Sequence, residues 1–299
     1  MLSERLRDRQ DENTEDALSR HSLGEFLTIQ LARDLADGEK AIVGTNSDIQ
    51  VGACNLARRM HAPNLWWVSG PGGMVNADDP VIRPTADFEN IANSEAVLDL
   101  PVMIDFIDWK IHFFDFAILG ALQIDKFGNI NTVCVGPHER PRLRGPGTVG
   151  ISALCGLSKR FYVMMLRHER GSFVEKVDFI SGAGHLDGGT SRTERGLPTG
   201  GPRLVVTPLG IFDFTPVEKR MHVKSLHAGV TLEEVRDRTG FDLACGASAP
   251  ITVEPTDREL ATLRQAVDTT GVLKAKFPWP PDRRAPVPPA NEANARSGG

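Results

Sequence analysis

The chain has 299 residues, 40% of them hydrophobic and 24% charged, so it holds enough apolar material for a large core. A formal net charge of −5, with no dense block of Lys and Arg, argues against nucleic acid as a partner. The charged first twenty residues do not resemble a secretory signal, and no apolar run reaches the roughly 18–20 residues of a membrane span. Four scattered cysteines are typical of reduced thiols, so we expect a cytoplasmic protein.

A helix and two short strands open the predicted fold. Ser22 and Glu25 form the pattern of a capping box, and apolar residues then recur at helical spacing to about residue 38. The apolar run 41–43 predicts a buried strand. A second helix is expected to begin with Asp48 as its cap and to end before Pro63. It leads into a second predicted strand.

Short strands and glycine-rich loops then alternate along the chain, which predicts one α/β domain whose sheet is covered by helices. The expected strands lie at 65–68, 117–122, 161–166, 177–180 and 204–206. Two more capping boxes, at 231–234 and 256–259, predict late helices. We place the domain at residues 21–275, after a charged N-terminal lead at 1–20. The Pro-rich segment 276–299 is expected to be a disordered tail, or to pack on a neighbouring chain through Trp279.

Three glycine-rich loops are candidates for ligand binding, at residues 69–74, 145–150 and 181–185. Glycines after strands let backbone amides approach a ligand, as an oxyanion hole requires, but glycines also simply turn the chain. The spacing leaves both interpretations open.

Other polar residues give weaker signals. His185, at the end of the third glycine loop, is the best histidine candidate for a cleft. The segment 125–131 has the composition of a tight hairpin turn, and it contains Asn129 and Asn131. His168 and Glu169 lack the second histidine of a zinc motif, so no metal site is predicted.

The segment 123–132, Q-I-D-K-F-G-N-I-N-T, resembles the Q-[IV]-D-x-[YF]-G-N-x-N-[ST] segment of two-subunit CoA-transferases, in particular the β subunit of the glutaconate type. Further similar segments follow in order between about residues 23 and 268. The resemblance implies a CoA-transferase-like α/β fold with an open, mostly parallel sheet. It also implies an α-type partner chain, in a heterodimer or an α2β2 heterotetramer, with the acyl-CoA site between the chains. Coenzyme A would be part of the substrate, with no tightly bound cofactor.

The chain departs from the family at the expected nucleophile. In the transferases, a glutamate of the β chain forms a thioester with CoA, and it lies just after the strand that follows an Ala-Pro pair. Counted without gaps from Pro63, this position falls on Gly70, and no Asp or Glu lies between residues 66 and 74. The nearest downstream acids are Asp78 and Asp79. The resemblance therefore implies no catalytic residue of the transferase type in this chain.

The β-type chain of the ring-opening hydrolase of steroid catabolism is similar and also lacks the glutamate. This favours hydrolytic C–C cleavage or another non-transfer reaction of an acyl-CoA, with a carboxylate of the partner as base. Two alternatives stay open: a CoA-transferase whose glutamate lies elsewhere, and a noncatalytic scaffold subunit. In the favoured interpretation, the residues expected to line the acyl-CoA pocket or oxyanion site are Ser69, Gly70, Gly72, Gly73, Gly147 and Gly150. The further cleft candidates are Asn129, Asn131 and His185.

Overall fold

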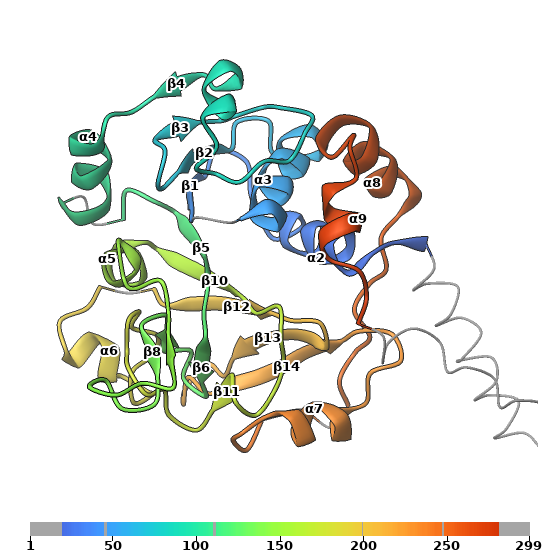
Figure 1. The fold of residues 1–299 in the computed structure, drawn as a ribbon. Helices are drawn as coiled ribbons and strands as arrows, with labels where there is room; N and C mark the ends of the chain where they lie inside the picture. Colours follow the sequence, from blue (N-terminus) through green and yellow to red (C-terminus); the bar gives the residue numbers. More distant parts are fainter. Residues whose placement is uncertain (1–19, 45–46, 110–111, 199, 247, 281–299) are drawn as a thin grey trace, which may run out of the picture.

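A sheet of nine strands forms the centre of the molecule, in the order β14-β13-β12-β10-β5-β1-β2-β3-β4 (Figure 1). The computed structural model describes residues 20–44, 47–109, 112–198, 200–246 and 248–280, so residues 1–19 of the expected lead and 281–299 of the expected tail lie outside it. The five central strands run parallel: β12 (Pro202–Val206), β10 (Arg160–Met164), β5 (Phe116–Gly120), β1 (Lys40–Val43) and β2 (Trp66–Ser69).

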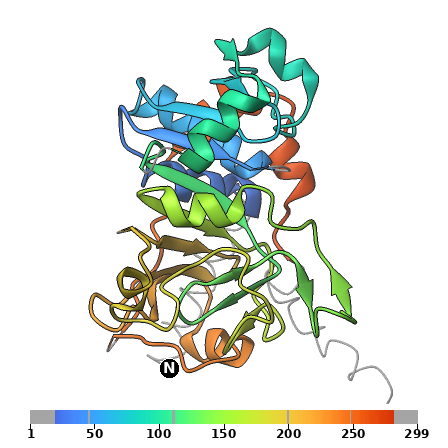
Figure 2. The same ribbon diagram turned by 90° about the vertical axis from the view of Figure 1, so that its left-hand side faces the viewer.

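Antiparallel strands extend the parallel centre on both sides. They are β3 (Met74–Val75) and β4 (Ala96–Val97) on one side, and β13 (Gly210–Phe214) and β14 (Met221–Leu226) on the other. The open α/β sheet is confirmed, and it is mixed, with its parallel part at the centre. Figures 1 and 2 place β4 at one end of the molecule, with α4 (Leu100–Ile104) and the short helix η1 (Phe88–Asn93) beside it.

Side chains of the central strands alternate between two apolar cores. In β1, Ala41 and Val43 belong to one core and Ile42 to the other, because successive side chains of a strand point to opposite faces. Trp67 belongs to the first core and Trp66 packs against the second, so these neighbours lie on opposite faces of the sheet.

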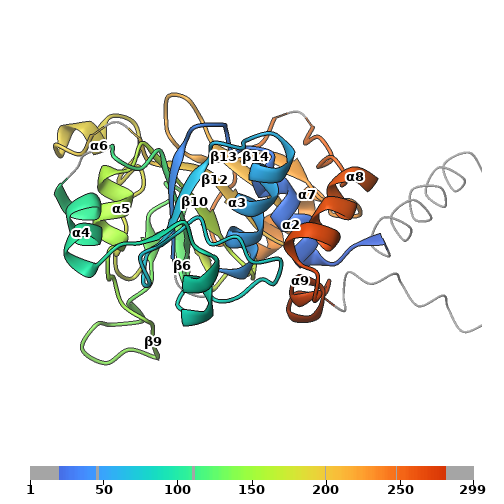
Figure 3. The same cartoon turned by 90° about the horizontal axis from the view of Figure 1, so that it is seen from above.

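Helices cover both faces, as expected for an α/β domain (Figures 1 and 3). The first core is covered by α2 (Leu23–Ala32), α3 (Asp48–Met60), α8 (Asp257–Thr262), η3 (Leu263–Val267) and α9 (Val272–Lys276). The second core is covered by α5 (Ile151–Leu157), α7 (Leu232–Arg238) and a small three-stranded sheet. The short helices η2 (Asp105–Trp109) and α6 (Ser191–Glu194) complete the described elements.

The small sheet contains the predicted hairpin. Its strands β6 (Gln123–Asp125) and β7 (Ile130–Asn131) pair antiparallel, and β11 (Phe173–Val174) pairs parallel with β6. Beyond β7, the strands β8 (Cys134–Val135) and β9 (Leu143–Arg144) form a separate hairpin that stands out from the body in Figure 3. The expected strand at 177–180 is wrong: this segment is irregular, and the Asp178 carboxylate there accepts hydrogen bonds from Gln123 and from the Gly136 N–H.

The helices begin close to the residues that the capping patterns predicted, and one N-cap differs by one residue. The capping boxes of Ser22 with Glu25 and of Thr256 with Glu259 are both formed. The cap expected at Asp48 is wrong by one residue, since Ser47 is the N-cap of α3 and Asp48 is the first helical residue. The Asp48 carboxylate instead forms an ion pair with Lys276, at 2.7 Å.

The chain remains packed beyond the expected domain boundary at residue 275. Trp279 is only 6% exposed and belongs to the first core, and its Nε1–H donates to the His21 carbonyl at 3.0 Å. The aromatic ring of Phe26 lies 5.5 Å from that of Trp279, centroid to centroid. Residues 276–280 are therefore part of the domain, and Trp279 packs on its own chain, which provides enough apolar contact to order this Pro-rich segment.

Among the described residues, no helix has both the length and the apolar character needed to cross a membrane.

Candidate active site

The path of the chain across the sheet reverses between β1 and β5. From β1 the chain moves to β2 and outward to β4, and it then returns to β5, on the other side of β1, and continues to β10 and β12. In open α/β sheets, ligands bind outside the carboxyl ends of the strands at such a reversal. The candidate site therefore lies where β1, β2 and β5 end.

Each of these three strands ends at a glycine. Gly44 follows β1, Gly70 follows β2, and Gly120 is the last residue of β5. A Cβ atom at Gly44 or Gly120 would lie 3.9 or 3.8 Å from its nearest neighbour outside the adjoining residues, and one at Gly70 would lie 3.3 Å from the Val43 carbonyl oxygen. Packing thus leaves room for a small side chain at Gly44 and Gly120, whereas a Cβ atom at Gly70 would press on the Val43 carbonyl, so the glycines keep this edge of the sheet open.

The loop after β2 is held by its own hydrogen bonds. The buried Ser69 hydroxyl donates to the Thr85 carbonyl at 2.6 Å and accepts the Gly72 N–H at 3.1 Å. The Gly70 N–H donates to the Val43 carbonyl at 2.9 Å, and the Gly73 N–H donates to the Ser69 carbonyl at 2.8 Å. Because these three amides have acceptors within the chain, the loop contributes a wall to the site rather than free donors.

Carboxylates downstream of this loop are engaged with arginines. Asp78 pairs with Arg59, and Asp79 pairs with Arg83. Glu95 accepts from Arg58 at 2.9 Å, and this hydrogen bond and one from Asn76 lower the pKa of Glu95. Asp78 and Asp79, the nearest downstream acids, are thus held in ion pairs and do not replace the missing glutamate in this arrangement.

The second glycine loop lies beside the carboxyl end of β5. A Cβ atom at Gly145 would come within 2.6 Å of Leu122, which follows β5 by two residues, and within 2.2 Å of the Thr132 carbonyl oxygen. The Gly147 N–H donates to that carbonyl at 3.2 Å, and the Thr132 hydroxyl donates back to the Gly147 carbonyl at 2.7 Å. Gly150 is the N-cap of α5, and its N–H has no acceptor among the described residues. The structure therefore brings two of the three predicted glycine loops, 69–74 and 145–150, to the same edge of the sheet.

Both candidate asparagines are buried and fully used in local hydrogen bonds. Asn131 donates to the Gln123 side chain at 2.7 Å and to the Cys134 carbonyl at 2.6 Å. Asn129 donates to both carboxylate oxygens of Asp125 and accepts from the Gly184 N–H at 2.9 Å. Burial raises the pKa of Asp125 despite these bonds. The asparagines thus fix the small sheet and its turn.

Two candidates lie towards the opposite end of the sheet. The turn that holds Asn129 packs at Gly128 against Pro202, the first residue of β12. His185 contacts Gly201, just before β12, and its ring centre lies 5.1 Å from that of Phe214. Asn129 and His185 therefore do not join the glycine loops at the carboxyl edge. Burial, helped by the nearby positive charges of Lys219 and Arg192, lowers the pKa of His185 to about 4, so the ring is neutral at pH 7.

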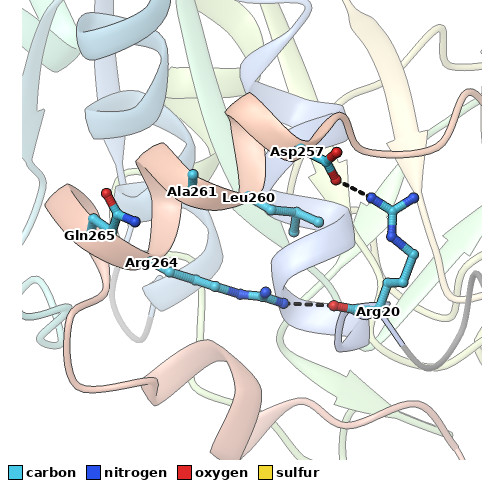
Figure 4. Close-up of a pocket in the computed structure, with 6 residues that line it drawn as sticks. All are labelled: Arg20, Asp257, Leu260, Ala261, Arg264 and Gln265. Carbon is cyan, nitrogen blue, oxygen red and sulfur yellow. Dashed lines mark hydrogen bonds and ion pairs between the residues drawn. The ribbon is translucent and has the colours of Figure 1, made fainter.

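A hollow on the helical face is not the candidate active site. It has a volume of about 390 Å³ and is lined by Arg20, Asp257, Leu260, Ala261, Arg264 and Gln265 (Figure 4). Arg20 pairs with Asp257, and Arg264 donates to the Arg20 carbonyl at 2.7 Å and to Glu25 at 2.6 Å. Its charged side chains are thus already paired within the chain, and the hollow lies over α8 and η3 rather than at the strand ends.

The sequence patterns did not single out one buried arginine and a group of three exposed arginines. Arg192 is 4% exposed, and all of its hydrogen-bond acceptors are backbone carbonyls. Arg140, Arg142 and Arg144 lie on the projecting hairpin that leads into the second glycine loop. The alternation of arginines over residues 140–144 was a signal in the sequence for an exposed strand with one basic face.

In the described parts of the chain, no group of three or more His, Cys, Asp or Glu residues is placed to hold a metal ion.

Comparisons with known proteins agree with this fold. Residues 110–238 match the family described as Coenzyme A transferase. Over 250 residues the chain is 34% identical to the B chain of the 3-oxoadipate CoA-transferase of Pseudomonas knackmussii, covering 83% of this chain and 94% of the relative. It is 28% identical over 244 residues to the IpdB chain of the cholesterol ring-cleaving hydrolase of Rhodococcus jostii, covering 82% of this chain and 91% of the relative. The solved glutaconate coenzyme A-transferase of Acidaminococcus fermentans superposes with a TM-score of 0.77 at 26% identity, covering 85% of this chain and 97% of that one.

The reversal point and the glycine-lined edge define an α/β protein with a candidate ligand site at the carboxyl ends of the central strands. The chain belongs to the coenzyme A transferase family. It aligns with β-type chains of that family over most of their length, which confirms the resemblance seen in its motifs.

Proposed function

We propose that this chain is the β-type subunit of a cytoplasmic two-chain enzyme that acts on an acyl-CoA thioester without supplying the transferase nucleophile. The α-type partner, in a heterodimer or an α2β2 assembly, provides the catalytic carboxylate. Coenzyme A enters as part of the substrate, with no tightly bound cofactor. The single observation that carries the proposal is Gly70, which directly follows β2 at the position expected for the transferase glutamate.

The reaction that fits this arrangement best is hydrolytic C–C cleavage of a bulky acyl group. The partner's carboxylate takes a proton from water, and the resulting hydroxide adds to a ring carbonyl of the acyl group. The adjacent C–C bond then breaks, and its electron pair is protonated on carbon. This chain provides the open edge at Gly44, Gly70 and Gly120, and the Gly150 N–H can donate to an oxyanion.

A second candidate function is CoA transfer between carboxylic acids. It is favoured by the 34% identity to a chain of a 3-oxoadipate CoA-transferase, and it requires a glutamate from another part of the complex. Covalent trapping separates the two reactions. The two-chain complex is incubated with acyl-CoA, treated with borohydride or hydroxylamine, and mapped by peptide mass spectrometry. A modified glutamate in either chain would refute the non-transfer proposal, whereas an unmodified complex that releases ring-opened or decarboxylated product would support it.

The third interpretation, a noncatalytic scaffold, is tested by filling the site. In Gly70→Trp and Gly147→Trp the new side chain enters the carboxyl edge, so we expect turnover to fall by at least tenfold while the two chains still assemble. Gly38→Trp is the matched control for Gly147→Trp, because Gly38 and Gly147 both have a positive φ and open space, but Gly38 precedes β1 at the opposite edge. If both site variants keep wild-type assembly and turnover, the pocket roles are wrong and the scaffold interpretation is favoured.

A further inference from the structure

A basic hairpin borders the candidate site. The segment 136–144, which we call the arginine arm, carries three arginines and one glutamate on a chain whose net charge is −5. The side chains of Arg140, Arg142 and Arg144 are exposed. Within the described residues, none of the three forms an ion pair, and Arg144 alone donates a side-chain hydrogen bond, to the His138 carbonyl at 3.2 Å. The arm is therefore a local positive region whose guanidinium groups are available for a ligand.

The arm is held in place by its own contacts. Val135 of β8 pairs with Leu143 of β9, and the Arg142 N–H donates to the Val135 carbonyl at 2.8 Å. The Gly136 N–H donates to the Asp178 carboxylate at 2.8 Å, which ties the arm to the body. A ring stack of His138 on Phe179, with centroids 5.7 Å apart, adds a second attachment. These contacts order the hairpin before any ligand binds, which lowers the entropic cost of binding.

The positions of the arginines suit an anion with several phosphates. Arg140 and Arg142 lie just before β9, are exposed, and donate no side-chain hydrogen bond within the described residues. Guanidinium groups bind phosphate oxygens in pairs and keep their charge at any physiological pH. Directly after the arm comes the glycine loop 145–150, which lies beside the carboxyl end of β5. An anion on the arm would thus be next to the place where the reacting thioester is proposed to lie.

We infer that the arginine arm binds the phosphate groups of coenzyme A, with Arg140 and Arg142 as its main contacts. This inference rests on the proposed function, because it assumes that the ligand of the glycine edge is a CoA thioester. A CoA molecule carries a 3′-phosphate and a diphosphate at the end opposite its sulfur. Binding that end on the arm leaves the pantetheine chain to run along the loop 145–150 towards Gly70.

The test measures how strongly the arm distinguishes CoA from pantetheine, which lacks these phosphates. Isothermal titration of the two-chain complex gives the Kd of each ligand for the wild type, for Arg142→Gln and for Arg140→Gln/Arg142→Gln. We expect each substitution to raise the Kd of CoA about tenfold, which is the change expected when one hydrogen bond to a charged group is lost. The Kd of pantetheine should change less than about twofold. The control is Arg195→Gln, another exposed arginine, since it lies near α6 rather than on the arm.

Three results would overturn the inference. The first is a wild-type complex that does not bind CoA, or variants that bind it as tightly as the wild type. The second is an equal loss for CoA and pantetheine, which would indicate a general distortion of the site. The third is loss of the partner chain from the arm variants in size-exclusion chromatography, because the arm would then be a subunit contact.

Turnover of acyl-CoA thioesters by the same preparations tests the proposed function separately. A complex that binds CoA through the arm but converts no acyl-CoA would refute the function and leave the arm as a CoA site. An active complex whose affinity is unchanged in the arm variants would refute only the role of the arm.

Discussion

The buried guanidinium of Arg192 holds three separate parts of the chain together. Its Nη1 donates to the carbonyls of Ala183 and Gly184 at 2.8 and 2.9 Å, and its Nη2 donates to those of Cys155 and Gly156 at 2.6 and 3.3 Å. The Nε–H donates to a fifth carbonyl, that of residue 198, at 3.2 Å. Burial lowers the pKa of Arg192, and no carboxylate lies among its hydrogen-bond partners. The charge is thus stabilised by carbonyl dipoles from α5, the third glycine loop and the segment after α6.

Replacement of Arg192 with methionine keeps much of the side-chain volume and removes all five N–H donors. Each buried carbonyl left without a partner costs about 1–3 kcal/mol, but water can reach some of them, and removal of the buried charge offsets part of the loss. We therefore expect Arg192→Met to lower the free energy of unfolding by about 3–5 kcal/mol, as for other broken buried charge networks. Arg192→Lys keeps a charge with fewer donors in a different geometry, so we expect it to lose about half as much.

Urea unfolding of the purified chain, followed by fluorescence and circular dichroism together, measures these losses. Arg195→Met is the matched control three residues further along, because Arg195 is largely exposed and its 3.5 Å ion pair with Asp187 should contribute less than about 1 kcal/mol. If Arg192→Met is destabilised no more than Arg195→Met, the carbonyl cluster does not stabilise the fold and the reasoning is wrong.

Three other substitutions test features of the fold. Trp279→Ala should lower the free energy of unfolding by about 2–4 kcal/mol in urea, because Trp279 is only 6% exposed, whereas a change below about 0.5 kcal/mol would place it outside the core. Burial opposes ionisation of Glu259, but hydrogen bonds from a neighbouring guanidinium lower its pKa from 4.5 to about 2, so this stabilisation is present above pH 4.5 and lost as the pH falls towards 2. The Tm of Glu259→Gln should therefore fall less than that of the wild type over this range, and parallel curves would contradict the assignment. Gly73→Ala should cost more than about 2 kcal/mol in thermal unfolding, since its Cβ would lie 2.1 Å from the Leu98 carbonyl oxygen at a φ of +64°. Gly147→Ala, which has a positive φ but open space, should cost only about 1 kcal/mol, and equal losses would show that backbone strain alone matters.

Much of the fold could be predicted because its central strands are short, continuous apolar runs. Residues 41–43 and 204–206 lie within β1 and β12, as expected for strands covered on both faces. The run 177–180 has a similar composition but is not a strand, because long-range hydrogen bonds to Asp178 determine its path. Trp279 was missed as a core residue for a related reason, since composition describes only its Pro-rich neighbours and not the aromatic residues it meets across the fold.

The candidate site could be predicted only in part. The structure places Gly70 and Gly147 at the same edge of the sheet, because loops that follow parallel strands meet there, and their roles in binding stay predictions. Asn129 and His185 were grouped with them in error, because β6 carries the chain away from that edge to the start of β12. A turn motif indicates local geometry but not where the turn lies on the sheet. The donors of Arg192 reach residues up to 37 positions away, a relation that no local pattern contains.

The packing of α2 against the far end of the chain determines when the molecule can finish folding on the ribosome. All ten residues of α2 are buried, and the Gly24 N–H donates to the Phe277 carbonyl at 2.9 Å. Trp279 and His21, which are hydrogen-bonded, lie 258 positions apart. At about 5–20 residues per second, the early helix waits roughly 13–50 s for its covering residues to be synthesised. During that time its apolar surface is open to other nascent chains, so a chain shortened before α9 should depend on chaperones far more than the loss of a few residues would suggest.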